Sequence, residues 1–155
     1  MGEAKGKRAP KPDGALRIAI ATQDMANLNA HFGSAKKFAI FDVMTEASAF
    51  VEAIGFDTVS DEGGKHAQDG DDRITPKVEA LDGVNLLFVN AIGGPAAAKV
   101  VKARIHPVKI AEAMSFDDVI ARVQTMMKGT PPPWLRKVLA VATGAEKPNF
   151  AEEDA

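Results

Sequence analysis

The sequence contains no cysteine and only three histidines among its 155 residues. A chain without cysteine forms no disulfide, and it lacks the thiolates that normally hold zinc or an iron–sulfur cluster. Imidazole is therefore the natural ligand that this protein could offer to a soft metal.

The sequence also lacks a long apolar run and a strong positive charge. No stretch approaches the roughly 20 apolar residues that span a bilayer, and the first 14 residues are too polar for a signal peptide. We therefore expect a cytoplasmic protein with no membrane partner. The net charge of -2 argues against nucleic-acid binding through bulk positive charge.

Hydrophobic residues make up 46% of the chain, which is enough for a folded domain with its own core. We expect a single domain over residues 15–141. Residues 1–14 are predicted to form a flexible basic tail, and residues 142–155 a flexible acidic tail.

The apolar periodicity predicts an α/β fold with the element order β-β-β-α-β-α-β-α. The short connection between the second and third strands favours an antiparallel meander, and the later alternation of helices and strands favours crossovers. The result would be a mixed five-stranded sheet flanked by helices. The strands are expected at residues 16–22, 37–43, 50–56, 84–89 and 105–110, and the three helices of this order at 73–81, 95–101 and 116–127. Residues 134–141 can form a further short amphipathic helix.

Two loops of this sheet are candidates for a binding site. Ligands of α/β sheets usually bind where loops leave the carboxyl ends of parallel strands. One such loop follows the strand at 16–22 and contains His31, and the other follows the strand at 84–89 and contains Asn90, Gly93 and Gly94. If these two strands are parallel neighbours, the loops lie side by side.

Each part of this candidate site has a functional and a structural interpretation. Gly93 and Gly94 precede a helix, where they could form a cradle for an anion or simply a tight turn. His31 lies in a polar Asn/Gly/Ser context, so it is either a metal ligand or an ordinary surface residue.

The other two histidines also allow two interpretations. His66 lies in an acidic, glycine-rich stretch that could be a lid with a metal ligand or a solvated linker. His106 lies in a predicted strand before Pro107, and we expect it to be packed or on a sheet edge. The sequence has neither a nucleophile elbow nor an HExxH motif.

Several segments, in the same order, resemble the nitrogenase iron–molybdenum cofactor biosynthesis family and its stand-alone carriers. The first is the His-Phe-Gly segment HFGSAKKFAIFDV, residues 31–43. The others are DRITPKVEAL, VNAIGGPAAAK, IHPVKI and MKGTPPPWLR, at residues 72–81, 89–99, 105–110 and 127–136.

This resemblance implies a ribonuclease-H-like fold and a non-enzymatic role in nitrogen fixation. Such proteins are thought to carry an iron–sulfur precursor cluster from the radical-SAM cofactor maturase to the nitrogenase cofactor scaffold complex. The proposed cluster-binding histidine of the family corresponds to His31, and His66 is a possible second metal ligand. The predicted cofactor-binding residues are His31, Gly33, Ser34, Lys36, Asn90, Gly93 and Gly94.

Two alternative functions are compatible with the sequence. A ribonuclease-H-like nuclease would need several carboxylates around two metal ions, and Asp42 is nearly alone among the acids on predicted strands. An interaction or regulatory module of the assembly complex would instead use the helix around Trp134 and the charged tails.

Overall fold

The computed structural model describes residues 11–12, 14–56 and 74–143, which include all the predicted strands. The acidic stretch with His66 and most of both predicted tails lie outside the described residues. The described part contains no helix that is long and apolar enough to cross a membrane.

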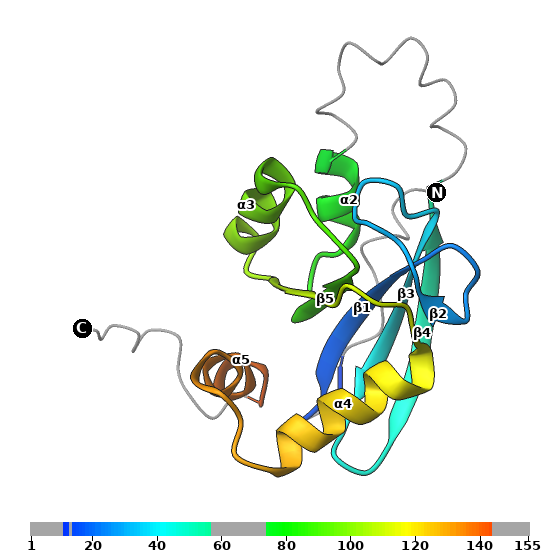
Figure 1. Ribbon diagram of the computed structural model, residues 1–155. Helices are drawn as coiled ribbons and strands as arrows, with labels where there is room; N and C mark the ends of the chain where they lie inside the picture. The colour runs from blue at the N-terminus through cyan, green and yellow to red at the C-terminus, as the bar shows by residue number, and fades with distance from the viewer. Residues whose placement is uncertain (1–10, 13, 57–73, 144–155) are drawn as a thin grey trace, which may run out of the picture.

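The described strands form a five-stranded mixed sheet in the order β4-β3-β1-β5-β6 (Figure 1). β1 pairs antiparallel with β3, which pairs antiparallel with β4, whereas β1 and β5, and β5 and β6, run parallel. The predicted meander and crossovers are thus confirmed. The strands are β1 Leu16–Thr22, β3 Lys37–Val43, β4 Ser48–Gly55, β5 Leu86–Val89 and β6 His106–Lys109.

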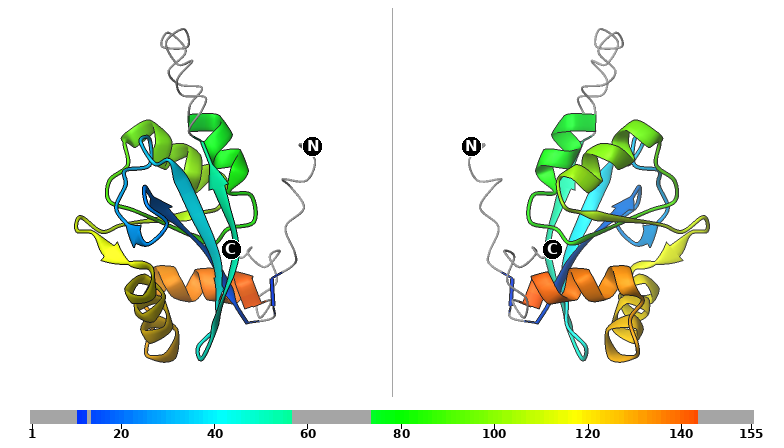
Figure 2. Two further views of the ribbon diagram at one scale, coloured as in Figure 1. Left: turned by 90° about the vertical axis from the view of Figure 1, so that its right-hand side faces the viewer. Right: turned by 90° about the vertical axis from the view of Figure 1, so that its left-hand side faces the viewer.

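Helices cover both faces of this sheet (Figure 2). One apolar core contains Ala19 and Ala21 of β1 together with residues of α2 and α3, and the other contains Ile18 and Ile20 together with residues of α4 and α5. Successive residues of β1 point to opposite faces, so both faces need apolar side chains. The helices are α2 Ile74–Ala80, α3 Gly94–Lys102, α4 Phe116–Lys128 and α5 Pro133–Thr143.

Helix α4 begins at the residue that the sequence predicts and ends one residue later, at Lys128. The Ser115 hydroxyl accepts a hydrogen bond of 3.1 Å from the backbone N–H of Asp118. This bond satisfies one of the N–H groups left open at a helix start. Gly129 follows the last residue, and its N–H donates to the carbonyl of Thr125.

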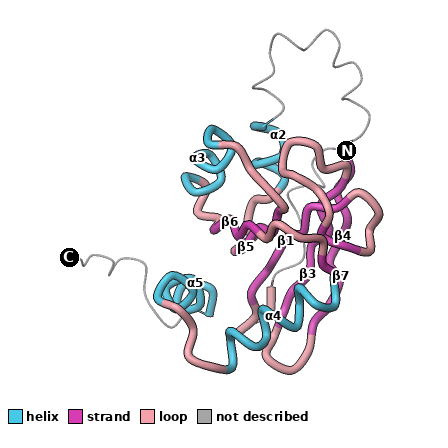
Figure 3. The backbone as a smooth tube through the Cα atoms, viewed as in Figure 1, coloured by secondary structure: helices cyan, strands magenta, loops and turns pink. Residues whose placement is uncertain are grey.

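A second, two-stranded sheet was not predicted. β2, Asn27–Leu28, pairs antiparallel with β7, Met114–Ser115. The long connection between β1 and β3 is otherwise loop (Figure 3). Strands of two residues carry no readable periodicity, which explains the omission. This small sheet ties the loop after β1 to the start of α4.

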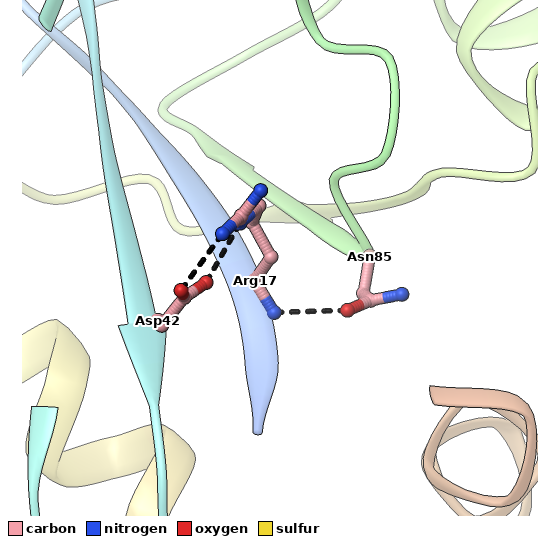
Figure 4. A network of polar contacts seen from close by, with 3 residues as sticks. All are labelled: Arg17, Asp42 and Asn85. Atoms are coloured by element: carbon pink, nitrogen blue, oxygen red, sulfur yellow. Dashed lines mark hydrogen bonds and ion pairs between the residues drawn. The ribbon is translucent and has the colours of Figure 1, made fainter. Parts of the chain in front are cut away.

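Arg17 and Asp42 form a buried ion pair across β1 and β3 (Figure 4). The Arg17 Nε and Nη2 groups donate to the two Asp42 carboxylate oxygens at 2.7 and 2.8 Å. This hydrogen bonding holds the pKa of Arg17 above its ordinary value, against the opposing effect of burial. The Asp42 carboxylate therefore serves the fold, which weighs against the nuclease interpretation.

Candidate functional site

The two loops that follow β1 and β5 lie side by side and are joined through their backbones. The N–H of Asn90 donates to the carbonyl of Ala30, and the N–H of Phe32 donates to the carbonyl of Ala91, both at 2.9 Å. This arrangement follows from the parallel pairing of β1 with β5. The predicted neighbourhood of the two loops is confirmed.

His31 lies between the two residues that make these bonds. Ala30 and Phe32 are buried, with exposed fractions of 2% and 1%, whereas His31 is exposed. The Phe32 ring packs against Phe38 of β3, with 5.6 Å between ring centroids. The structure thus presents an exposed imidazole on a backbone that is fixed on both sides.

The turn that follows His31 is hydrogen-bonded to Lys77 of α2. The Lys77 ammonium donates to the carbonyls of Phe32, Gly33 and Ala35 at 3.0, 2.9 and 3.2 Å. It also lies 5.9 Å from the Phe32 ring centroid and 5.2 Å from that of Phe56. The sequence analysis did not single out Lys77.

A signal for Lys77 is nevertheless present in the sequence. The apolar stripe of the helix comprises Ile74, Val78 and Leu81, and Lys77 lies on the same side, one turn before Leu81. A charged residue on a buried helix face usually has a specific partner. The position of those partners, more than 40 residues earlier in the chain, could not be read from the pattern.

Gln23 is hydrogen-bonded to the same turn. Its side-chain Nε2 donates to the carbonyl of Ser34, and its Oε1 accepts from the N–H of Lys36, both at 3.0 Å. The carbonyl of Lys36 accepts from the N–H of Phe56. Ser34 and Lys36 are both exposed.

Asp24 organises the loop between β1 and β2. Its carboxylate accepts hydrogen bonds from the backbone N–H groups of Ala26 and Asn27 and from the side chains of Thr22, Asn27 and Asn29. These bonds favour the ionised form and lower the pKa of Asp24 to about 2. The neighbouring Met25 adopts a left-handed backbone with a φ of 60°.

The glycines of the candidate site leave space beside the loops. Gly93 is extended, with φ -76° and ψ 161°, and none of Gly33, Gly93 and Gly94 has a positive φ. A Cβ on Gly93 would come no closer than 4.0 Å to Pro95, and one on Gly33 or Gly94 would meet nothing within 4 Å. Neither unusual φ nor packing against the described residues therefore requires these glycines.

Asn90 is engaged within the protein. Its side-chain amide donates to the carbonyls of Ile110 and Glu112, at 2.9 and 3.3 Å. Asn90 therefore links the loop after β5 to the chain after β6. The N–H groups of its side chain stabilise the loop, so contact with a ligand is left to its other atoms.

The two described histidines, His31 and His106, do not come together. His66 lies outside the described residues. His106 is the first residue of β6, and its ring stacks on Trp134 of α5 at 4.1 Å between centroids. It pairs with Leu86 at the start of β5, whereas the candidate site follows the end of β5. In the described residues no group of three or more His, Asp or Glu side chains could hold a metal ion.

These observations define a mixed α/β domain with a candidate ligand site at the carboxyl ends of the parallel strands β1 and β5. The model of the dinitrogenase iron–molybdenum cofactor family matches residues 14–126, and the chain belongs to that family. This membership supports a role in iron–molybdenum cofactor biosynthesis.

The chain is similar to protein NifX of Sinorhizobium fredii, with 62% identity over 145 residues that cover 94% of this chain and 91% of that one. It also matches part of the FeMo cofactor biosynthesis protein NifB of Bradyrhizobium diazoefficiens, with 30% identity over 76% of this chain and 25% of that protein. The apo orange protein of Desulfovibrio gigas shares the fold, with a TM-score of 0.53 and 17% identity over 76% of this chain and 92% of that structure.

Proposed function

We propose that this protein binds an iron–sulfur precursor of the iron–molybdenum cofactor and passes it on during cofactor assembly, without catalysing a reaction itself. The observation that carries the proposal is the exposed His31 imidazole on a backbone hydrogen-bonded to the neighbouring loop. Membership in the cofactor family supports the choice of cargo.

The chemistry of the site suits reversible binding. A single imidazole can ligate an exposed iron atom of a preformed cluster, but it cannot build a stable iron–sulfur site, which normally needs several thiolates. Weak capture is an advantage for a carrier, because its cargo must leave. His66 is proposed as a second ligand that reaches the same cargo.

The residues around His31 fit a cargo that is large and anionic. Gly33, Gly93 and Gly94 are exposed and leave room for close approach. The start of helix α3 at Gly94 carries a partial positive charge, which favours an anion. Lys36 and the Ser34 hydroxyl could supply outer contacts, and Asn90 keeps the second loop in place.

The proposed partners are the radical-SAM cofactor maturase, as donor, and the nitrogenase cofactor scaffold complex, as acceptor, in the cytoplasm. The match to part of NifB supports a place in the cofactor assembly machinery. The sheet order β4-β3-β1-β5-β6 supports the ribonuclease-H-like assignment of the fold. We take residues 15–141 as the carrier domain.

The proposal is tested by mixing the protein anaerobically with the isolated cluster precursor, followed by gel filtration and iron analysis. We expect iron to co-migrate with the wild-type protein. If no iron co-migrates, the protein is not a carrier of that precursor.

The role of His31 is tested with His31→Ala in the same assay. Loss of a ligand should lower iron retention about tenfold or more, since even the partners of metal ligands contribute about 10- to 100-fold. The matched control is His106→Gln, which removes a histidine at the other end of the sheet and should leave retention unchanged. Equal retention by His31→Ala and the wild type would remove His31 from the site.

A further inference from the structure

The ammonium of Lys77 is buried against the turn that follows His31. Lys77 is 6% exposed, and its Nζ lies within 2.9–3.2 Å of the carbonyl oxygens of Phe32, Gly33 and Ala35. An ammonium has three N–H groups, so three backbone carbonyls match its donors. A buried ammonium is costly unless it is hydrogen-bonded, and its position is therefore tightly coupled to this turn.

Together with its neighbours, Lys77 fixes the direction of every peptide carbonyl in the turn. The carbonyls of Phe32, Gly33 and Ala35 point to Lys77, that of Ser34 accepts from Gln23, and that of Lys36 accepts from the N–H of Phe56. These acceptors form one continuous run, residues 32–36. An anionic ligand at this turn would thus meet few outward carbonyl lone pairs.

The peptide N–H groups of the turn are oriented by the same contacts. In a trans peptide the N–H points opposite to the C=O, and the structure contains no cis peptide in its described part. Because the carbonyls of Phe32 and Gly33 point to Lys77, the N–H groups of Gly33 and Ser34 point away from it. Gly33 and Ser34 are themselves exposed and directly follow His31.

We propose that Lys77 is a positioning residue for cargo binding. Its ammonium holds the turn in the conformation that sets the His31 imidazole and directs the N–H groups of Gly33 and Ser34 toward an anionic cluster. Lys77 does not touch the cargo and acts through the turn. This inference rests on the proposed function for its cargo, but the conformation of the turn can be measured without cargo.

A double-mutant cycle separates positioning from a general effect on the fold. Lys77→Met keeps the apolar stem beside Phe32 and Phe56 and removes the three hydrogen bonds. It should lower retention of the isolated iron–sulfur precursor about tenfold. In a His31→Ala background the same change should cost less than in the wild type, because the imidazole is already gone and only the N–H groups of Gly33 and Ser34 remain to be positioned. Wild-type retention by Lys77→Met, or losses that add fully in the double variant, would overturn the inference.

The absence of cysteine allows a closer chemical control. Lys77→Cys carries the only thiol of the chain, and it can be alkylated in the unfolded protein with bromoethylamine or with iodoethane before refolding. The first product restores an ammonium at nearly the length of lysine, and the second ends in a methyl group. Retention per folded protein should return with the ammonium and not with the ethyl group; equal retention by the two products would refute the assignment.

Hydrogen exchange tests the conformation of the turn in the absence of cargo. The N–H groups of Phe32 and Lys36 are hydrogen-bonded to the Ala91 carbonyl and the Gln23 side chain. They should exchange faster in Lys77→Met, whereas the N–H of Ile110, which donates to Val89, should not change. Unchanged exchange at Phe32 and Lys36 would refute positioning by Lys77, even for a wild-type protein that retained no iron.

Lys77→Gln, which keeps one or two donors, provides a milder variant in case Lys77→Met does not fold. It should show a smaller increase in exchange at the same two amides.

Discussion

At the scale of single residues, burial of polar groups is matched by specific hydrogen bonds. Arg17, Thr22, Asp42 and Lys77 are the buried polar residues of the described chain. Arg17 and Asp42 bind each other near the start of β1, the Thr22 hydroxyl at its end accepts from the N–H of Met25, and Lys77 binds three carbonyls. The end of β1 at the candidate site is therefore built by side chain–backbone contacts, and the opposite end by an ion pair.

Asp42→Asn is expected to destabilise the protein strongly. The change removes the negative charge that faces the Arg17 guanidinium, whose side chain is only 6% exposed. Breaking a buried pair on one side typically costs about 3–5 kcal/mol. Urea unfolding followed by circular dichroism measures this loss. The double change Arg17→Met with Asp42→Leu should cost much less, and a double variant as unstable as Asp42→Asn would contradict the explanation.

Asp24→Asn should change how stability depends on acid pH. The hydrogen bonds to the Asp24 carboxylate lower its pKa in the folded protein to about 2, below the ordinary value of 3.8. Their stabilising effect is therefore complete above about pH 4 and is lost as the pH falls towards 2. The difference in melting temperature between the wild type and Asp24→Asn should shrink across this interval. A difference that stays constant from pH 5 to pH 2 would contradict the assignment.

At the scale of elements, helix α5 is attached to the sheet at the end remote from the candidate site. Leu135 is fully buried in the core that contains Ile18 and Ile20, and Trp134 stacks on His106 with an interplanar angle of 5°. Burial lowers the pKa of His106. The attachment of α5 therefore favours the neutral imidazole.

Mild acid should weaken this attachment. The folded-state pKa of His106 is below its ordinary value of about 6.5. The stabilisation is thus fully present above about pH 6.5 and is lost as the pH falls through the lowered pKa. Trp134 is the only tryptophan of the chain, so its fluorescence during thermal unfolding at pH 7.5 and 5.5 reports on α5 directly. His106→Gln should reduce the difference between the two pH values, and an unreduced difference would assign it to another group.

At the scale of the whole molecule, the sheet separates two apolar cores. The proposed cargo binds at the carboxyl ends of β1 and β5. The α2 and α3 side contains Phe32, Phe38 and Leu87, whereas the α4 and α5 side contains Phe88, Val119 and Leu135. The loops at the candidate site are attached to both: Lys77 reaches them from α2, and β2 pairs with β7 just before α4. Binding at this site should therefore stabilise the entire domain.

Cargo binding should raise the melting temperature by an amount that grows with the logarithm of the ratio of free cargo to its dissociation constant. A ligand at 100 times its dissociation constant stabilises the folded state by about 2.7 kcal/mol, which corresponds to a shift of roughly 5–10 °C for a protein of this size. Anaerobic differential scanning fluorimetry with increasing precursor measures the shift. His31→Ala should show little shift at the same concentrations, and an equal shift would place the cargo elsewhere.

The sequence predicts the sheet well because each strand has a local signature. Leu16, Ile18 and Ile20 alternate with Ala19 and Ala21, and this pattern indicates a strand covered on both faces. The positions of His31 and of the Gly93–Gly94 loop then follow from chain topology, because both come after parallel neighbours. The adjacency of the two loops is therefore encoded in the order of the strands along the chain.

The contacts that shape the candidate site were harder to predict from the sequence. Lys77 binds carbonyls 42 to 45 residues earlier in the chain, and Gln23 brackets a turn 11 to 13 residues later. Such contacts depend on the packing of α2 against the loop and leave no periodic trace in the sequence. The β2–β7 pairing is similarly non-local, since it joins Asn27 to Ser115.

The backbone bonds between the two loops constrain how a cargo would leave. Opening a gap between the loops would break the bonds from Asn90 to Ala30 and from Phe32 to Ala91 together. Release by hinge-like opening is therefore costly, whereas the exposed face of His31 is free for approach. Hand-over should proceed by associative ligand exchange, in which an acceptor's ligand attacks the cluster before the imidazole departs. The transfer rate should then increase with acceptor concentration.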